Sequence, residues 1–149
     1  RPLSPAAMAG PFRHRPAVAE LNRMLVGTAP GHLGIEVTEL GEDFLRATMP
    51  VDERTKQPFG LLHGGSSVLL AETLASLAGW LCLDPELKQQ SAGIEINANH
   101  LRAVTAGVVT GTARPIHLGR ATQVWEIRIE DEQGRLACIS RMTAAVIGA

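Results

Sequence analysis

Apolar residues recur along the chain with two different periods, and each period predicts a type of element. Residues 1–15 hold scattered Pro, Gly and Arg without either period, so we expect a flexible N-terminal arm there. From Pro16, which suits a first helical turn, the pattern becomes helical: Val18, Leu21 and Leu25 recur every three or four positions, which predicts a short helix that ends within the glycine-containing run 27–31. Residues 16–149 contain no linker and no internal repeat, which predicts a single domain.

Alternation of apolar and polar residues predicts the strands. Residues 33–38 and 44–49 alternate on either side of a short polar turn, so we expect them to pair, and the polar loop 50–60 follows. In the last third of the chain, the run 115–119 is typical of a turn that interrupts the strands. Four further strands are expected there, near residues 94–100, 107–113, 125–129 and 136–147.

The segment 64–82 is apolar on nearly every side, and it stops before Asp84 and Pro85. A helix of this kind must be enclosed rather than laid on a surface. The alternative, a membrane span over residues 61–83, is disfavoured by Glu72 at its middle, because a charge there is costly in lipid.

The layout predicts an α+β domain in which one antiparallel sheet wraps around one long central helix. A single curved sheet leaves an edge uncovered, which favours dimerisation or a higher oligomer.

Composition disfavours several classes of function. The formal net charge is −1, so no basic surface indicates nucleic acid or an anionic membrane as a partner. Aromatic residues make up 3% of the chain, fewer than base-stacking modules usually carry. Cys82 and Cys138 stand in apolar surroundings without a CxxC spacing, so we expect two buried, reduced thiols and a cytoplasmic protein.

Within the long helix, Glu72 is the only acidic or basic side chain between Gly64 and Leu83. A lone carboxylate in an enclosed helix costs several kcal/mol unless it is paired or protonated. Two interpretations are open. The carboxylate could form a structural pair with His100 or Arg102, or it could be retained for chemistry.

The start of the same helix offers hydrogen-bond donors. Gly64 and Gly65 carry backbone N–H groups of the first turn, where the helix dipole adds positive potential, so a developing oxyanion could bind there. Gln57 can donate an amide hydrogen bond to a carbonyl oxygen, and His63 can orient the loop, bind substrate or cap the helix. Glu72 follows about two turns later, near the same face. An ordinary N-cap turn would account for the glycine pair equally well.

Three separated motifs, in order, resemble one family. They are QPFGLLHGGSSVLLAET at residues 57–73, GIEINANH at 93–100, and PIHLG at 115–119 followed by QVW at 123–125. Together they resemble the hot-dog fold acyl-CoA thioesterases that act on aromatic acyl-CoA, over about residues 33–147. The resemblance implies a hot-dog fold, hydrolysis of acyl-CoA or acyl-carrier-protein thioesters, and no cofactor or metal.

The resemblance also implies roles for individual residues. Glu72 matches the catalytic carboxylate, which acts as nucleophile or general base. Gln57 and Gly64 match the groups that hold and polarise the thioester carbonyl. His63 matches the histidine beside them, and Ser76 matches a hydroxyl that helps to place water.

A second group of residues matches positions that contact substrate in this family. These are His100, Arg102, His117, Gly119 and Arg120 for the CoA moiety, and we expect Leu77 to line the acyl pocket. Arg120 stands where a relative in this family has a small polar residue, so it is either a stronger phosphate contact or a solvated surface charge. The family forms homotetramers, as dimers of dimers, with active sites at the dimer interface.

Three alternatives remain open. A hot-dog dehydratase would also place a histidine and a carboxylate at a helix start. A non-catalytic acyl-CoA binding module would keep the fold without turnover, although the chain shows no DNA-binding appendage to support it. A metal site built from His63, His100 and His117 is disfavoured, because these residues lack an HxH or HExxH spacing.

Overall fold

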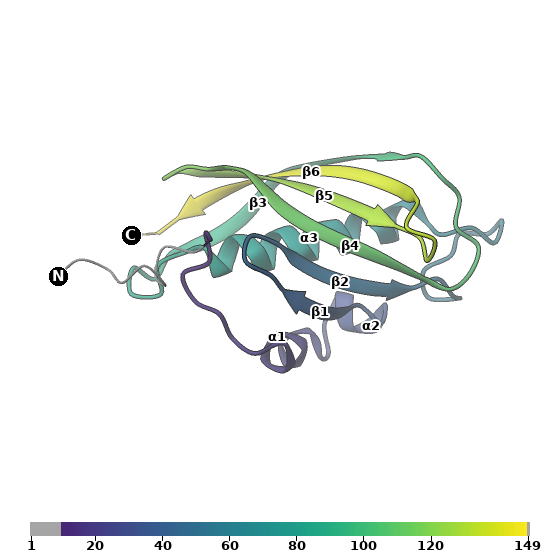
Figure 1. Cartoon of the computed structure of the whole chain (residues 1–149), viewed down its shortest axis with the longest axis horizontal. Coiled ribbons are helices and arrows are strands. Elements are labelled where there is room, and N and C mark those ends of the chain that lie inside the picture. Colours follow the sequence, from purple (N-terminus) through teal and green to yellow (C-terminus); the bar gives the residue numbers. More distant parts are fainter. Residues whose placement is uncertain (1–9, 149) are drawn as a thin grey trace.

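The computed structural model describes residues 10–148, and its centre is one long helix held by a single sheet (Figure 1). In chain order the elements are α1 (Val18–Leu25), α2 (Ala29–His32), β1 (Glu36–Leu40), β2 (Leu45–Pro50), α3 (Gly64–Leu81), β3 (Gln90–His100), β4 (Val108–Leu118), β5 (Thr122–Glu130) and β6 (Leu136–Ile147). Within the described residues the sheet has six strands in the order β1-β2-β4-β5-β6-β3, and every neighbouring pair is antiparallel. The predicted α+β arrangement of one sheet around one central helix is confirmed.

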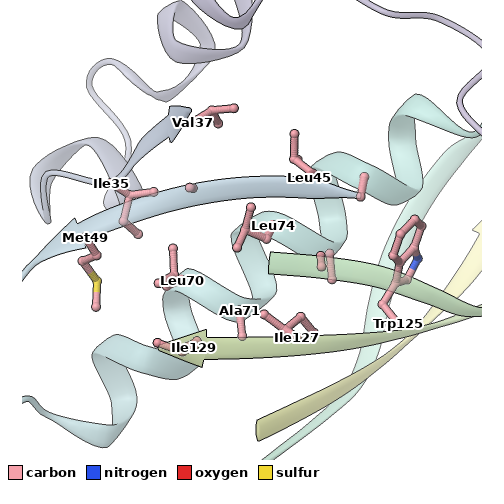
Figure 2. Packing of buried hydrophobic residues seen from close by; sticks show 14 of the residues in the cluster. Ile35, Val37, Leu45, Met49, Leu70, Ala71, Leu74, Trp125, Ile127 and Ile129 are labelled. Carbon is pink, nitrogen blue, oxygen red and sulfur yellow. The ribbon is translucent and has the colours of Figure 1, made fainter. Parts of the chain in front are cut away.

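The core lies between the sheet and one side of α3 (Figure 2). Leu70 and Leu74 of α3 join Ile127 and Ile129 of β5 in a single cluster, and all four side chains are fully buried. Each buried side chain of this size contributes about 2 kcal/mol to stability. The sheet backbone approaches closely at Gly111 on β4, where a Cβ atom would lie 2.8 Å from Cδ1 of Leu74.

The sheet encloses only one side of α3, so the prediction of a fully enclosed helix is wrong for the single chain. The other side carries half-buried residues: Val68, Leu69, Glu72, Thr73, Ser76, Leu77 and Trp80. The six-stranded sheet is open and does not close around α3, and most of the side that it leaves uncovered is apolar. Despite this character, no helix among residues 10–148 combines the length and apolarity that crossing a bilayer requires.

The predicted turn at 115–119 is wrong, because β4 continues to Leu118 and pairs with β5. The register shifts between Pro115 and His117, and this irregularity accommodates a residue that has no N–H to donate to the ladder. The chain reverses at residues 119–121 instead.

Other boundaries also differ from prediction, and the first is that α1 begins at Val18 instead of Pro16. α2 occupies the run in which the first helix should merely end, and Pro30 in its first turn suits a helix start. β1 begins at Glu36 instead of 33, because Leu33 caps α2 and Gly34 follows with a positive φ of 74°. β3 starts at Gln90 instead of 94, since it pairs with β6 as far as Ile147.

The predicted N-terminal arm is described only from Gly10 onward, because residues 1–9 lie outside the described residues. The part that is described packs on the C-terminal end of α3. Phe12 is buried, and the Arg13 N–H donates to the Leu81 carbonyl at 2.8 Å. The His14 ring meets the Trp80 ring edge to face at 4.5 Å. This segment therefore satisfies a carbonyl that the helix end leaves unpaired.

The core contacts predict the effect of truncating a helix residue. Leu74→Ala should lower the free energy of unfolding by about 2–5 kcal/mol, because the fixed sheet cannot collapse into the cavity. Denaturant unfolding followed by circular dichroism, at one protein concentration, measures this. As a control, Leu87→Ala alters a side chain that is 47% exposed, and it should change stability by less than about 1 kcal/mol. Similar losses in both variants would contradict this account of the core.

Candidate active site

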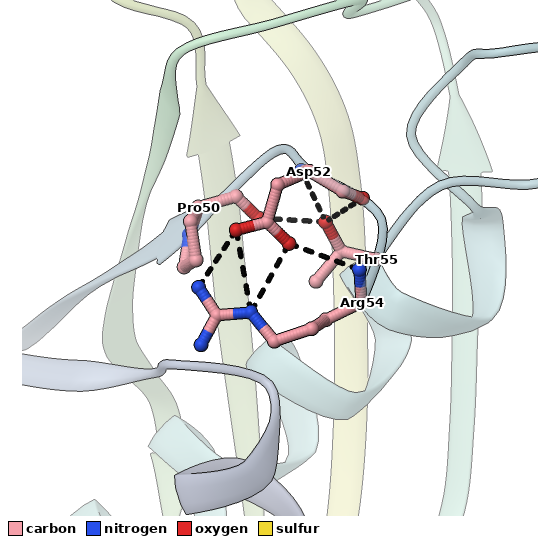
Figure 3. Close-up of polar contacts among 4 residues, drawn as sticks. All are labelled: Pro50, Asp52, Arg54 and Thr55. Carbon is pink, nitrogen blue, oxygen red and sulfur yellow. Dashed lines mark hydrogen bonds and ion pairs between the residues drawn. The ribbon is translucent and has the colours of Figure 1, made fainter.

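The loop between β2 and α3 is held by a compact hydrogen-bonded turn (Figure 3). The Arg54 guanidinium donates to the Asp52 carboxylate at 2.7 Å, and the hydrogen bonds from Arg54 lower the pKa of that carboxyl. The Thr55 hydroxyl donates to the Pro50 carbonyl at 2.7 Å. The Thr55 carbonyl in turn accepts the His63 N–H at 2.8 Å, which ties the turn to the start of α3.

His63 is the N-cap of α3. Its Nδ1 atom accepts the Gly65 N–H at 2.8 Å. In neutral His63 the proton therefore resides on Nε2. One of the two predicted glycine donors is thus already used, whereas the Gly64 N–H has no acceptor among residues 10–148. The capping interpretation of His63 is correct, and only Gly64 keeps a free donor for a ligand.

Gln57 and Gly64 line one cavity at the start of α3, which we call the entrance cavity. It measures about 360 Å³, and its lining also includes His100 and Arg102. The Gln57 Oε1 atom accepts the Phe59 N–H at 2.5 Å, so the amide NH2 group is left as a donor.

His100 restricts what can stand at the start of α3. A Cβ atom on Gly64 would lie 2.7 Å from the His100 Nε2 atom, so a larger residue there would displace this ring. His100 therefore belongs to the surroundings of the free Gly64 donor. The structural pairing of Glu72 with His100 or Arg102, which the sequence left open, is not among the ion pairs of residues 10–148, and both residues line the entrance cavity.

Glu72 lies in a second depression, which we call the Glu72 groove, on the open side of α3. The groove measures about 480 Å³ and is lined by Ala29, Pro30, Gly65, Val68, Leu69, Glu72, Thr73 and Ser76. The Glu72 carboxylate is half-buried and has no hydrogen-bond or ion-pair partner among residues 10–148. Ser76 lies one turn further along, with its hydroxyl 3.9 Å from the sulfur of Met142. A carboxylate without a partner is available as a nucleophile or a base.

The two depressions are separate in one chain. Gln57 and Gly64 line the entrance cavity, whereas Glu72 and Ser76 line the groove. Eight residues of helix separate Gly64 from Glu72, a distance of about 12 Å along the axis. A carbonyl bonded to the Gly64 N–H is therefore out of reach of the Glu72 carboxylate on the same helix.

The predicted CoA contacts also fall into two groups. His100 and Arg102 lie at the N-terminal end of α3. Gly119 and Arg120 line a third cavity of about 380 Å³ at the C-terminal end, together with Arg13. The His117 ring packs on Gly119, where a Cβ atom would lie 2.6 Å from its Nε2 atom. Because α3 is about 27 Å long, one chain does not bring the two groups together.

No group of three His, Cys, Asp or Glu side chains within the described part of the chain could hold a metal ion. The three histidines considered above do not converge, since His63 and His100 lie near the start of α3 and His117 near its end.

The cysteines are free, as predicted, but Cys82 is only half-buried. Burial raises the pKa of the Cys82 thiol to about 12 and also raises that of Cys138, so neither is a thiolate nucleophile at neutral pH.

Two features of the Glu72 groove were missed by sequence reasoning. Ala29 and Pro30 form part of its wall, and the only signal for their helix is a proline two residues after Thr28. Gly93 on β3 borders the carboxylate, since a Cβ atom there would lie 2.7 Å from Glu72 Oε1. Gly93 begins one of the three motifs, but nothing in the sequence gives it a role.

Comparison with known proteins identifies the family. The thioesterase superfamily model matches residues 59–138. The 1,4-dihydroxy-2-naphthoyl-CoA hydrolase of Escherichia coli is 52% identical over 136 residues, which cover 91% of this chain and 98% of the relative. A proofreading thioesterase of Cronobacter turicensis is 59% identical over 128 residues, covering 86% and 92%. The crystal structure of a Haemophilus influenzae thioesterase superposes with a TM-score of 0.90 at 51% identity, covering 93% of this chain and 95% of that one.

These likenesses confirm the hot-dog fold that the three motifs imply, and they extend over most of the chain. They also confirm that the chain is an enzyme that hydrolyses thioesters. With α3 and most of the sheet inside the matched region, the chain belongs to the thioesterase superfamily.

Proposed function

We propose that this thioesterase hydrolyses acyl-CoA, with a preference for aromatic acyl groups, and that Glu72 is its catalytic carboxylate. One observation carries the proposal: the Glu72 carboxylate lies unpaired in an open groove on an otherwise apolar helix. An unpaired, half-buried carboxylate adds little to the stability of the fold, so its presence on this helix favours a chemical role. A relative named as a hydrolase of an aromatic acyl-CoA supports the acyl preference.

In the proposed reaction, the thioester carbonyl oxygen accepts hydrogen bonds from the Gly64 N–H and the Gln57 amide. Glu72 then follows one of two routes. It attacks the carbonyl carbon, releasing the CoA thiolate and forming a mixed anhydride that water hydrolyses, or it removes a proton from a water that attacks directly. Ser76 helps to place the water. The two donors stabilise the oxyanion that forms in either route.

We propose that each active site is shared between two chains. Supporting this, Gly64 and Glu72 of one helix lie too far apart to act on one carbonyl, and they line separate depressions. β3 is an edge strand of 11 residues whose Ile94 is 64% exposed. Long edges are normally paired or covered. Antiparallel pairing of β3 with a second copy would bring the Glu72 groove near the partner's Gln57.

Several finer assignments belong to the same proposal. Two such dimers form a homotetramer, as the resemblance implies, and the enzyme works in the cytoplasm, where free thiols stay reduced. Leu77, half-buried on the open side of α3, lines the acyl pocket. The CoA moiety contacts His100, Arg102, His117, Gly119 and Arg120, and its two groups of contacts come from different chains.

The role of Glu72 predicts a large loss of rate. Glu72→Gln should lower kcat for benzoyl-CoA by more than about a hundredfold, because neither attack nor proton removal can proceed. Thiol release, followed with a disulfide reagent, measures this. Glu20→Gln, which neutralises an exposed carboxylate on α1, serves as the matched control and should keep wild-type activity. A Glu72→Gln variant with near wild-type turnover would defeat the assignment.

The acyl preference is tested by the same assay across substrates. Benzoyl-CoA should give a higher kcat/KM than octanoyl-CoA or acetyl-CoA, and the corresponding acyl-carrier-protein thioesters show which carrier is used. Release of thiol distinguishes hydrolysis from dehydration, which leaves the thioester intact. Higher kcat/KM for the aliphatic substrates would contradict the aromatic preference, and absence of turnover would favour a binding module.

The shared site predicts that two inactive variants complement each other. Gln57→Ala and Glu72→Ala, mixed under conditions that exchange subunits, should recover about a quarter of wild-type activity, because half of the dimers are hybrids with one intact site. Each variant incubated with itself is the control. If both are inactive alone, no recovery despite proven exchange would place Gln57 and Glu72 in the same chain's site.

A further inference from the structure

Gly93 lies directly against the Glu72 carboxylate. A Cβ atom on Gly93 would be 2.7 Å from Glu72 Oε1 and 3.5 Å from the sulfur of Met142. The first distance is shorter than the van der Waals contact of carbon and oxygen, so an added methyl group and the carboxylate cannot both keep their places. Since the carboxylate is the far end of a flexible side chain, it would be the group that moves.

The need for glycine at this position concerns space, not backbone conformation. Gly93 is absent from the glycines with positive φ, so an alanine could adopt its backbone angles. The strand is irregular here, because the register of β3 against β6 shifts between Gly93 and Glu95. Bulges of this kind often lie beside active sites and alter the direction of nearby side chains.

Packing alone determines where the Glu72 carboxylate lies. No hydrogen bond or ion pair holds it within residues 10–148. Met142 is fully buried, and its sulfur lies 3.9 Å from the Ser76 hydroxyl and 3.5 Å from the place of a Cβ atom on Gly93. Gly93 therefore borders the carboxylate directly, and Met142 also limits the space at Gly93. Catalytic groups must be held close to their productive geometry, and small displacements reduce rates strongly.

We propose that Gly93 is a positioning residue for Glu72: its missing Cβ leaves the space in which the carboxylate lies along β3, at the edge where a second copy would pair. The inference rests on the proposed catalytic role of Glu72. It assigns to the first residue of the GIEINANH motif a function that acts through Glu72 and not through contact with substrate. Because the carboxylate can swing away, the effect of a larger residue falls on rate more than on stability.

The first test compares two glycine substitutions on strands that face α3. Gly93→Ala should lower kcat for benzoyl-CoA by about tenfold or more, with KM changed less than about twofold and Tm nearly unchanged. Gly111→Ala is the matched control, since its Cβ would meet Leu74 in the core and not Glu72. It should lower Tm while the folded enzyme keeps kcat within about twofold of wild type. Wild-type kcat in Gly93→Ala would overturn the inference.

A double-mutant cycle tests whether the effect acts through Glu72. Glu72→Asp shortens the side chain by one methylene and withdraws its carboxylate from Gly93. Adding Gly93→Ala to this variant should cost less than about twofold in the single-turnover rate, measured with enzyme in excess so that slow reactions are resolved. Equal losses in both backgrounds would show that Gly93 acts elsewhere. Failure of the proposed function is distinct, because it would appear as wild-type turnover in Glu72→Gln.

Discussion

The packing of one side of α3 against the sheet is the interaction on which the rest of the structure depends. Leu70 and Leu74 are fully buried there, which fixes both the rotation and the position of the helix. Because the helix cannot rotate, the residues on its other side are also fixed in position. Glu72 then lies in a groove and Gly64 at the helix start, on a rigid element that loop movements do not displace.

This arrangement separates the two groups to which the proposal assigns the chemistry. Gly64 and Glu72 stand about 12 Å apart along one helix axis, which is much longer than a thioester carbonyl bond. The same sheet that holds α3 ends in an exposed strand, β3, which passes Glu72 at Gly93. The proposed pairing of this edge with a second copy would account for both the open edge and the separation of the two groups.

The environment of Glu72 shows how a carboxylate can stay unpaired on an apolar helix. An ion pair would stabilise the charge but would also compete with substrate. Here the groove leaves the side chain partly solvated, and the nearest neighbour that gives its carboxylate space is an uncharged residue, Gly93. His63, by contrast, caps the helix through its Nδ1 atom, which is one of the three roles that the sequence left open.

The sequence alone determined the fold class, the long helix, the position of Glu72 as the one charged residue of that helix, and the family, because apolar periodicity and short motifs are local properties of the chain. It could not determine that β4 continues through Pro115 or that α2 borders the Glu72 groove, since a bulge and a helix of four residues depend on their neighbours. Only the tertiary structure placed Gly93 beside Glu72 and separated Gln57 from it. Such contacts join residues that are distant in sequence, and their distances are decided by how the strands pair and how the helix packs.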